Sequence, residues 1–512
     1  MMSADGFDYG KGGRFMKKKL CALALAVLLL LPGTGTAAMS NAFTDSYTSY
    51  GYNAWGDSIE MPDGYVPEQV LYGQDMGTTA LSEPADFYIA DDGTAYLADA
   101  GNNRILKLDG NLRVMQEWTG TVGADGTEYP FSRPTGVYLD STRTLYVADS
   151  GNGRVVKMNM DGHLDRFFLA PDDSDVQTMV EYKPSKVLVD NSGVVYVLVS
   201  GLYRGAITYD AQGNFLGFFG SNTVEMQISL LWKRFTRLFM TREQLEKQWR
   251  NIPVEFSNFD LDANGFVYTC SSGLLTDAST NELKKINFAG SNIYRGSRSG
   301  TPTAWNSGNF GDVEVAYVNG SRVDTSFVDL SVDSDGFVTS VDTTRGRVFQ
   351  YDSSANLIFA FGGIGTQAGT FQIPSAVETF ENHIYVLDSA KNNLTIFKRT
   401  EYGDAVWNAV VKYNRGEYVE TIPAWETVLK INSNCEMAYV GMGKAYYQLG
   451  EYETALGFFE QGNDTEGRSM AFAAYRSVWI GQNFGWLLLA LIALCVGLPV
   501  TVSILRRRKR RG

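Results

Sequence analysis

The strongest constraint on the fold is a sequence pattern that recurs every 50 residues. Its first two copies share a starting proline, an aspartate that ends an apolar run, and an arginine five residues later: Pro84, Asp99 and Arg104, then Pro134, Asp149 and Arg154. A third copy starts at Pro184, and looser copies start at Phe256, Phe327 and Pro374. A fixed period of this length is typical of one structural unit repeated along the chain, so the sequence predicts six similar units.

A complete copy contains four short runs of β-branched and aromatic residues, separated by Asp-Gly, Asn-Gly or Gly-Asn pairs that favour tight turns. Four-stranded sheets repeated around an axis form a β-propeller, and closing the ring removes its exposed edges. The sixth copy lacks a fourth strand, and an unassigned strand at 69–72 precedes the first copy. The sequence therefore predicts a mainly β chain with a six-bladed β-propeller over 66–400, closed by that strand.

The motif of a strand, an aspartate, a small residue, Gly-Asn and an arginine resembles the NHL repeat. It is found from Asp99 to Arg104 and from Asp149 to Arg154. The resemblance extends over residues 66–400 and is most specific in the first two copies. NHL propellers include lyases, lactonase-like relatives and pure binding platforms, so the resemblance implies the fold and leaves the activity open.

A second repeat follows the propeller. The tripeptide Gly-Glu-Tyr at 416–418 recurs 34 residues later at 450–452, among apolar residues at helical spacing. This pattern resembles tetratricopeptide repeats and predicts a small helical domain over 401–482. Two copies are fewer than the usual minimum of about three. Residues 467–480 are therefore expected to add a capping helix, or else the pair leans on the propeller. Such a domain either binds a peptide or helix or serves as a spacer.

Two apolar segments lie outside the predicted domains. Residues 16–38 show lysines, an apolar run and small residues in that order, which is typical of a secretory signal peptide. Residues 1–15 precede that pattern and are interpreted as an artefact of an upstream start codon. Residues 484–505 carry no charge and would form about 33 Å of helix, enough to cross a bilayer.

Six basic residues lie in the tail at 506–512. Basic flanks stay on the cytoplasmic side of a membrane. The sequence therefore predicts a single-pass protein of the cell membrane, with its propeller outside the cell and its C-terminus in the cytoplasm.

Composition excludes several classes of function. Residues 39–505 hold 33 basic and 55 acidic side chains, and such a surplus of negative charge repels nucleic acid. The chain has only two histidines and four cysteines, which disfavours a histidine-based zinc site or a Ser-His-Asp hydrolase. Any catalysis would depend mostly on carboxylates.

One ring of residues could carry chemistry at the channel of the propeller. It is formed by the third residue of each first strand: Asp86, Gly136, Lys186, Asn258, Asp329 and Ala376. First strands line the channel, so Asp86, Lys186, Asn258 and Asp329 are the candidate ligand-binding residues for a small polar ligand. A divalent cation such as calcium could also bind there, and no other cofactor is predicted. The alternative is that these charges only neutralise one another.

A second ring is expected to be structural. The residues that end the second strands are mostly short and polar: Asp99, Asp149, Val199, Ser271, Asp342 and Asp388. Such side chains can accept hydrogen bonds from the amides of the following turn.

The third and fourth copies are longer than the others, with predicted insertions near 221–252 and 296–325. Both follow a fourth strand and therefore lie on the face of the channel mouth. The first insertion combines an apolar stripe at helical spacing with a basic cluster, which predicts a helix that docks on an acidic protein or a membrane surface. Its candidate contacts are Trp232, Lys233, Arg234 and Arg237. The alternative is a helix that packs on its own propeller.

Two hypotheses about function remain. The first is a membrane-anchored extracytoplasmic binding or assembly module that recognises a protein or a small polar ligand, for example in a transport or envelope complex. The second is a metal-dependent lyase or lactonase-like enzyme that uses Asp86, Asn258 and Asp329 around the channel. No paired acid and base stand at a recognisable spacing, which favours binding over catalysis.

Overall fold

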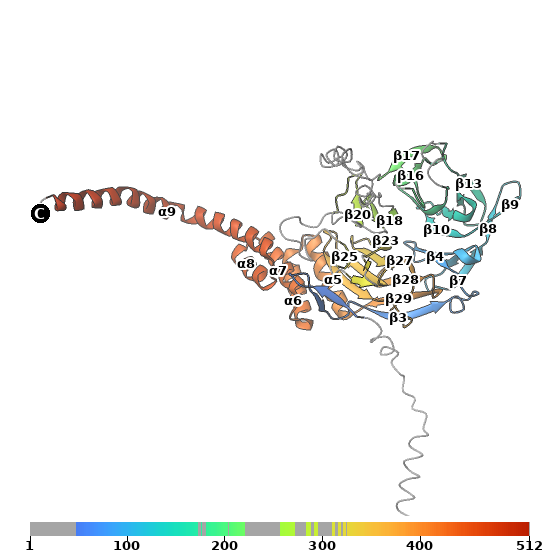
Figure 1. Ribbon diagram of the computed structural model, residues 1–512, viewed down its shortest axis with the longest axis horizontal. Helices are drawn as coiled ribbons and strands as arrows, with labels where there is room; N and C mark the ends of the chain where they lie inside the picture. Colours follow the sequence, from blue (N-terminus) through green and yellow to red (C-terminus); the bar gives the residue numbers. More distant parts are fainter. Residues whose placement is uncertain are drawn as a thin grey trace, which may run out of the picture. The chain divides into compact units, whose positions relative to one another are not determined.

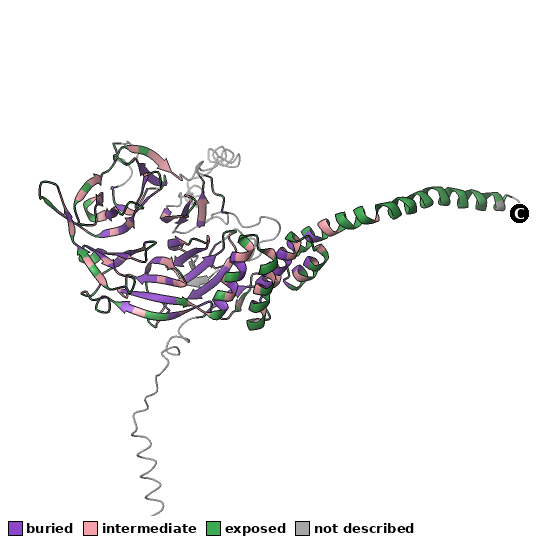
Figure 2. Ribbon diagram, turned by 180° about the vertical axis from the view of Figure 1, so that it is seen from behind, coloured by how far each residue is buried: buried purple, intermediate pink, exposed green. Residues whose placement is uncertain are grey.

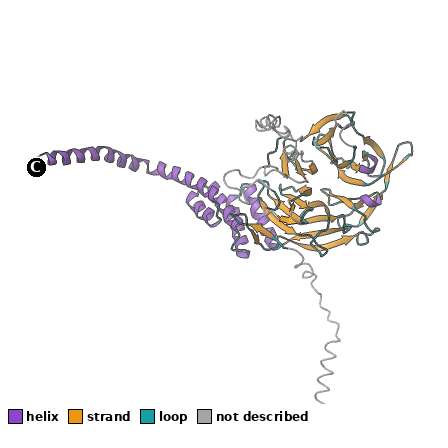
Figure 3. Cartoon of the chain, in the orientation of Figure 1, coloured by secondary structure: helices purple, strands orange, loops and turns teal. Residues whose placement is uncertain are grey.

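The computed structural model describes residues 48–172, 176, 181–202, 204–220, 256–271, 283–287, 291–294, 310–312, 316–318, 321–323 and 325–510. The predicted signal peptide, the segment before it and the predicted docking helix lie outside these residues. The described part of the chain consists of small sheets followed by helices (Figure 1, Figure 3).

Six sheets form a closed β-propeller. The first strands contact one another in the order β4, β10, β14, β18, β23, β27 and back to β4. Blade 1 contains β4 (Pro84–Ile89), β5 (Ala95–Asp99), β6 (Arg104–Leu108) and β7 (Val114–Trp118), and blade 2 contains β10 (Pro134–Leu139), β11 (Leu145–Asp149), β12 (Arg154–Met158) and β13 (Leu164–Phe168). Blade 3 contains β14 (Pro184–Val189), β15 (Val195–Val199), β16 (Ala206–Tyr209) and β17 (Phe215–Phe219), and blade 4 contains β18 (Phe256–Leu261), β19 (Val267–Ser271) and β20 (Leu283–Ile286). Blade 5 contains β23 (Phe327–Val332), β24 (Val338–Asp342), β25 (Arg347–Tyr351) and β26 (Leu357–Gly362), and blade 6 contains β27 (Pro374–Phe380), β28 (His383–Asp388), β29 (Asn393–Arg399) and β3 (Tyr65–Tyr72). The predicted six-bladed architecture is confirmed.

The ring closes through the strand that precedes the first copy. β3 pairs antiparallel with β29, with Leu71 opposite Leu394. The sequence predicted this pairing for residues 69–72, and the strand starts earlier, at Tyr65. The sequence did not predict β1 (Tyr50–Tyr52) and β2 (Ser58–Glu60), which extend blade 5 beyond β26.

The tight turns between strands of the blades are stabilised by the same local hydrogen bonds. Asp140 follows the first strand of blade 2, and its Oδ1 accepts hydrogen bonds from the backbone N–H groups of Thr142 and Thr144, both at 2.9 Å. The same pair of bonds recurs at Asp109, Asn159, Asp190, Asp210, Asp262, Asp333 and Asp352. Short polar side chains stabilise tight turns in this way. Some of the aspartates that make the chain acidic therefore stabilise the turns of the hairpins.

Further short strands lie in the connections between the blades. β8 (Gly120–Val122) pairs with β9 (Glu128–Pro130), and β21 (Ala316–Val318) pairs with β22 (Ser321–Val323). The second pair lies within the predicted insertion at 296–325.

Helices follow the last blade. They are α5 (Glu401–Asn414), α6 (Tyr418–Ile431), α7 (Glu436–Gln448), α8 (Tyr452–Gln461) and α9 (Thr465–Lys509). The 34-residue repeat is visible in their packing. The rings of Tyr413 and Tyr418 lie 5.5 Å apart, and those of Tyr447 and Tyr452 lie 5.3 Å apart. The structure confirms a helical region, and its assignment to the tetratricopeptide class stays a prediction.

The helices pack on the propeller. Trp407 of α5 stacks on Phe337 of blade 5 with ring centroids 3.8 Å apart, and Arg415 forms an ion pair with Asp335 at 3.0 Å. Blades 5 and 6 share one hydrophobic core with α5, α6 and α7. The first turns of α9 cover α8, where Ala471 is fully buried. Both expected ways of stabilising a short helical pair are therefore present.

α9 continues beyond this cap. Among the described helices it is the one long and apolar enough to cross a membrane, judged by length and composition. Its residues after Ala471 are largely exposed (Figure 2). This is compatible with the predicted single-pass anchor.

Candidate functional site

The first strands of all six blades contain a β-bulge at the same place. In blade 1, Pro84 pairs with Asp99 and Asp86 pairs with Ala98, so the second residue of the strand has no partner. The other five first strands skip the same position. A bulge adds one residue to a strand and changes the direction of the side chains next to it. The bulge therefore determines which side chains face the channel.

The second residues, not the third ones, form the ring that lines the channel mouth. They are half-buried, and they line one cavity with a volume of about 520 Å³: Ala85, Thr135, Ser185, Ser257, Val328 and Ser375. Most of the predicted third residues are buried instead. Asp86 is 5% exposed, whereas Asn258 and Asp329 are each 3% exposed. Lys186 is the member of the predicted ring that lines the cavity.

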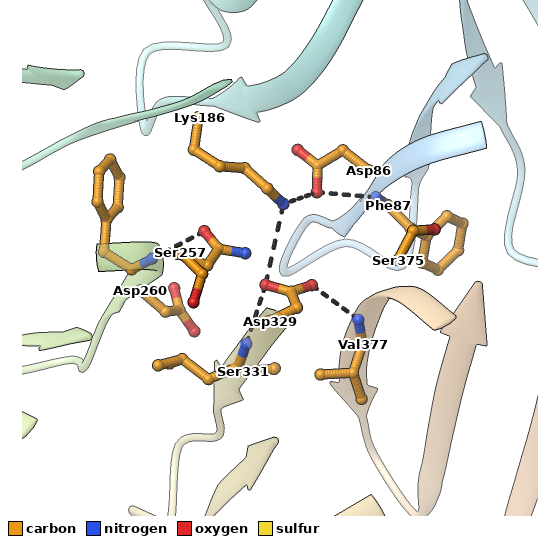
Figure 4. A network of polar contacts seen from close by, with 12 residues as sticks. Asp86, Phe87, Lys186, Ser257, Asp260, Asp329, Ser331, Ser375 and Val377 are labelled. Atoms are coloured by element: carbon orange, nitrogen blue, oxygen red, sulfur yellow. Dashed lines mark hydrogen bonds and ion pairs between the residues drawn. The ribbon is translucent and has the colours of Figure 1, made fainter. Parts of the chain in front are cut away.

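Three of the four predicted ligand-binding residues meet at the axis. The ammonium group of Lys186 pairs with a carboxylate oxygen of Asp86, and it lies 3.8 Å from an oxygen of Asp329 (Figure 4). These side chains come from blades 1, 3 and 5, so one cation joins alternate blades. Asn258 makes a local contact, in which its Oδ1 accepts a hydrogen bond from the backbone N–H of Phe259 at 2.7 Å.

The two aspartates also join neighbouring blades. Asp86 Oδ2 accepts a hydrogen bond from the backbone N–H of Val137 in blade 2 at 2.8 Å. Asp329 Oδ2 does the same with Val377 in blade 6 at 2.7 Å. The other oxygen of each carboxylate accepts the amide of its own next residue. Both carboxylates are therefore held by backbone amides in addition to Lys186.

Two further acids belong to this network, and the sequence analysis did not single them out. Asp260 Oδ2 accepts the backbone N–H of Val332 at 2.7 Å, and Glu378 Oε2 accepts the hydroxyl of Ser331 at 2.9 Å. Both occupy the fifth position of their first strands. Comparing that position across the copies would have shown it to be acidic in two of them.

Burial sets the protonation of the network. Desolvation raises the pKa of Asp260 to about 7, and it raises the pKa of Asp329 to about 7 as well. Desolvation, together with Asp260 and Asp329, raises the pKa of Glu378 well above its usual value. Burial alone would lower the pKa of Lys186, but the carboxylates of Asp329 and Asp86 outweigh it and raise that pKa. Lys186 therefore stays a cation that compensates buried acids.

This arrangement is poorly suited to a metal ion. Within the described ranges, no cluster of three or more His, Cys, Asp or Glu side chains could hold one. A cation at the predicted site would have to displace Lys186 and compete with the amides that bind Asp86 and Asp329. What the axial network does show is a set of contacts that join blades 1, 2, 3, 5 and 6.

The ring at the ends of the second strands is structural, as expected, but its contacts differ between blades. Asp99 Oδ1 accepts the backbone N–H of Ser82, and Oδ2 accepts both Asn102 and Arg104, all at 2.8 Å. Blade 2 repeats this set around Asp149. Blades 5 and 6 show the predicted bonds to the following turn, at Asp342 and Asp388.

The partner-docking residues predicted in the first insertion, Trp232, Lys233, Arg234 and Arg237, lie outside the described residues. Among the described residues of the second insertion, Asp312 has a buried carboxylate. Asp312 binds Arg345 at 2.6 Å and Arg347 at 2.7 Å, and it accepts the hydroxyls of Tyr50 and Tyr52. This contact fixes β1 and part of the insertion on blade 5.

These observations define the class of protein: a six-bladed β-propeller joined to a helical region that includes one candidate membrane helix. The NHL repeat family model matches residues 131–158, which contain blade 2 up to its third strand. No curated protein sequence matches the chain.

Solved structures show distant similarity to this chain. A virginiamycin B lyase from Staphylococcus aureus aligns with a TM-score of 0.37 and 8% identity, over 65% of this chain and 99% of the lyase chain. A protein of unknown function from Bacteroides thetaiotaomicron aligns with a TM-score of 0.38 and 10% identity, over 69% of this chain and 76% of its own. Similarity at this level does not indicate what this chain binds or catalyses.

Proposed function

We propose that this chain is a membrane-anchored extracytoplasmic module that binds a protein or a small polar ligand through its propeller. The observation that carries the proposal is that the charged side chains at the axis are already engaged in contacts within the protein. Asp86 and Asp329 are engaged by backbone amides and Lys186, so they are poorly placed to act as acid, base or metal ligand. A cavity that the described residues line with small hydroxyl side chains adjoins them, which suits recognition.

The proposed orientation places the propeller outside the cell. The apolar part of α9 and the basic residues that follow it support a single span with a cytoplasmic C-terminus. Protease added to intact cells is expected to degrade the propeller and to leave a tag on the C-terminus protected. A propeller that survives until the cells are lysed would contradict the orientation, and with it the extracytoplasmic role.

The proposed protein contact is the basic segment of the first insertion. Full-length chain with Lys233, Arg234 and Arg237 changed to glutamate should capture less of its partner from membrane extracts than the unchanged chain. A matched control reverses three basic residues elsewhere, Lys107, Lys412 and Lys430, and should retain the partner. Equal capture by both variants would move the contact to another surface.

The same preparation tests the enzyme alternative. Turnover of a lactone or lyase substrate that stops on chelation and returns with added calcium would replace the binding proposal. Its loss in both Asp86→Ala and Asp329→Ala would place the chemistry on the axis.

A further inference from the structure

We propose that the cavity at the channel mouth binds a neutral polyhydroxylated ligand of the size of a mono- or disaccharide. This inference rests on the proposed function, because it names the ligand class of the same propeller face. It is carried by the ring of second residues that the bulges turn toward the cavity. The volume of the cavity, about 520 Å³, lies in the range of small-molecule binding sites.

Four members of the ring are hydroxyl residues whose protons are already committed. Thr135 Oγ1 donates to the carbonyl of Pro184 at 3.1 Å, and Ser257 Oγ donates to that of Phe327 at 2.7 Å. Ser375 Oγ donates to the carbonyl of Pro84 at 2.9 Å. The fourth is Ser185, whose Oγ donates to the backbone carbonyl of Leu198 at 3.4 Å, the longest of these four bonds.

A carbonyl oxygen can only accept, so each hydroxyl points its hydrogen at the backbone. Its lone pairs are then left for a ligand. The cavity therefore offers a ring of oxygen acceptors, and a complementary ligand has several hydrogen-bond donors. The hydroxyl groups of a polyol meet that requirement.

The charges that line the cavity favour a neutral ligand. They belong to Glu83, Arg133 and Lys186. Arg133 pairs with Glu83 at 2.8 Å, and Lys186 pairs with Asp86 and Asp329. A charged ligand would have to compete with one of these pairs or remain without a partner of opposite charge, whereas a neutral ligand leaves every pair in place.

Apolar side chains complete the wall. Pro84, Val328 and Ile373 line the same cavity, and Ile373 is 55% exposed. The C–H faces of a sugar ring can pack on such residues while its hydroxyls reach the oxygen ring. The combination of acceptors, paired charges and apolar wall is what selects a polyol over a purely apolar ligand.

The experiment uses the full-length chain in lipid nanodiscs and three probes that share one ring but differ in charge: glucose, glucuronate and glucosamine. Trehalose and sucrose extend the neutral set. Saturation-transfer NMR and calorimetry are expected to detect at least one neutral sugar and to show weaker binding of both charged analogues. Tighter binding of glucuronate or glucosamine, or no neutral sugar bound at 50 mM, overturns the inference.

Variants locate the binding. Ser185→Ala removes the hydroxyl that makes the longest hydrogen bond to the backbone. It should weaken the affinity for the neutral sugar about five- to tenfold, the usual contribution of one neutral hydrogen bond. Ser185→Leu should abolish binding, because it removes the hydroxyl and places a bulky apolar side chain on the cavity wall. The control Ser192→Ala changes an exposed serine of the same blade and should leave affinity unchanged. Wild-type affinity in Ser185→Leu would place the sugar elsewhere and overturn the assignment.

The outcomes separate this inference from the proposed function. Capture of a protein partner without any sugar binding would refute the polyol site and leave the binding module standing. Sugar turnover that depends on calcium would refute the binding module itself.

Discussion

At the scale of single residues, the propeller axis depends on Lys186. Its ammonium group is the cation that faces two carboxylates from other blades, Asp86 and Asp329, and all three side chains are largely removed from water. The ammonium group contributes to stability mainly because it compensates the buried carboxylates, since an unpaired buried charge is costly. The net attraction within such a buried pair contributes less. Variants at this position should therefore be informative.

Lys186→Met should lower the free energy of unfolding by about 3–5 kcal/mol, the usual effect of removing one partner of a buried ion pair. The methionine keeps most of the length of the side chain and removes the charge that compensates both carboxylates. Denaturant unfolding of the purified protein measures the change. Lys183→Met is the control, because Lys183 pairs with Glu181 in a largely exposed position. It should cost less than 1 kcal/mol. Equal effects of the two variants would contradict a special role of Lys186.

The buried acids predict a pH dependence. Desolvation raises the pKa of Asp260 and of Asp329 to about 7, far above the value near 4 that they have in an unfolded chain. Between these values the folded protein holds more protons than the unfolded one, so stability falls as pH rises from 4.5 to 7.5. Asp260→Asn cannot ionise and should flatten this fall in thermal melts taken across that range.

A control acid lies outside the network. Hydrogen bonds from Thr127 lower the pKa of the exposed Asp125, so its titration lies below this window. Asp125→Asn should leave the slope between pH 4.5 and 7.5 unchanged. A wild-type protein that becomes more stable over the same window would refute the assignment of protonated acids at the axis.

At the scale of elements, two strands near the N-terminus stabilise the propeller in different ways. β3 is the outer strand of blade 6, so it closes the ring with a segment far from that blade in sequence. β1 only extends blade 5, through the pairing of Tyr50 with Ala360. The first contact removes an exposed sheet edge and the second adds to an existing sheet.

Removal of residues 65–72 should therefore unfold the propeller or make it oligomerise through the exposed edge of β29. Removal of residues 48–60 should lower the melting temperature and leave a monomer. Thermal melting and light scattering compare the two deletions. A monomeric protein with unchanged melting after loss of 65–72 would show that blade 6 needs no fourth strand.

At the scale of the whole molecule, the helical region is attached to the propeller by packing as well as by the chain. Trp407 stacks on the ring of Phe337 with ring centroids 3.8 Å apart, and the guanidinium carbon of Arg399 lies 4.1 Å from the centroid of the Trp407 ring. The backbone N–H of Ala54 also donates to Glu436 on α7 at 2.9 Å. The helices thus link the propeller to α9 through a packed interface.

Trp407→Ala should weaken this attachment by about 3 kcal/mol, as for other large aromatic truncations. We expect faster proteolytic cleavage between β29 and α5 and an early separate unfolding transition. Trp55→Ala serves as the control, because Trp55 is 70% exposed. A single unchanged transition in Trp407→Ala would show that other contacts hold the two regions together.

The sequence by itself determined the repeat, the number of blades, the helical region and the strand that closes the ring. These features follow from local patterns, such as the alternation within each strand and the Asp-Gly turns, which act within a few residues. It also placed Asp86, Lys186, Asn258 and Asp329 around the propeller axis, because equivalent positions in a repeat surround that axis.

Only the tertiary structure decided which ring faces the cavity. The bulge after Pro84 and its five equivalents shift by one residue the alternation of side chains between the two faces of each first strand. Most third residues are therefore buried, and hydroxyl residues such as Ser185 and Ser257 line the cavity at the channel mouth. The bulges come with bonds between neighbouring blades, such as that from Val137 to Asp86, which no single copy contains. The direction of a side chain at a bulge depends on its neighbours in space, and a period of two cannot predict it.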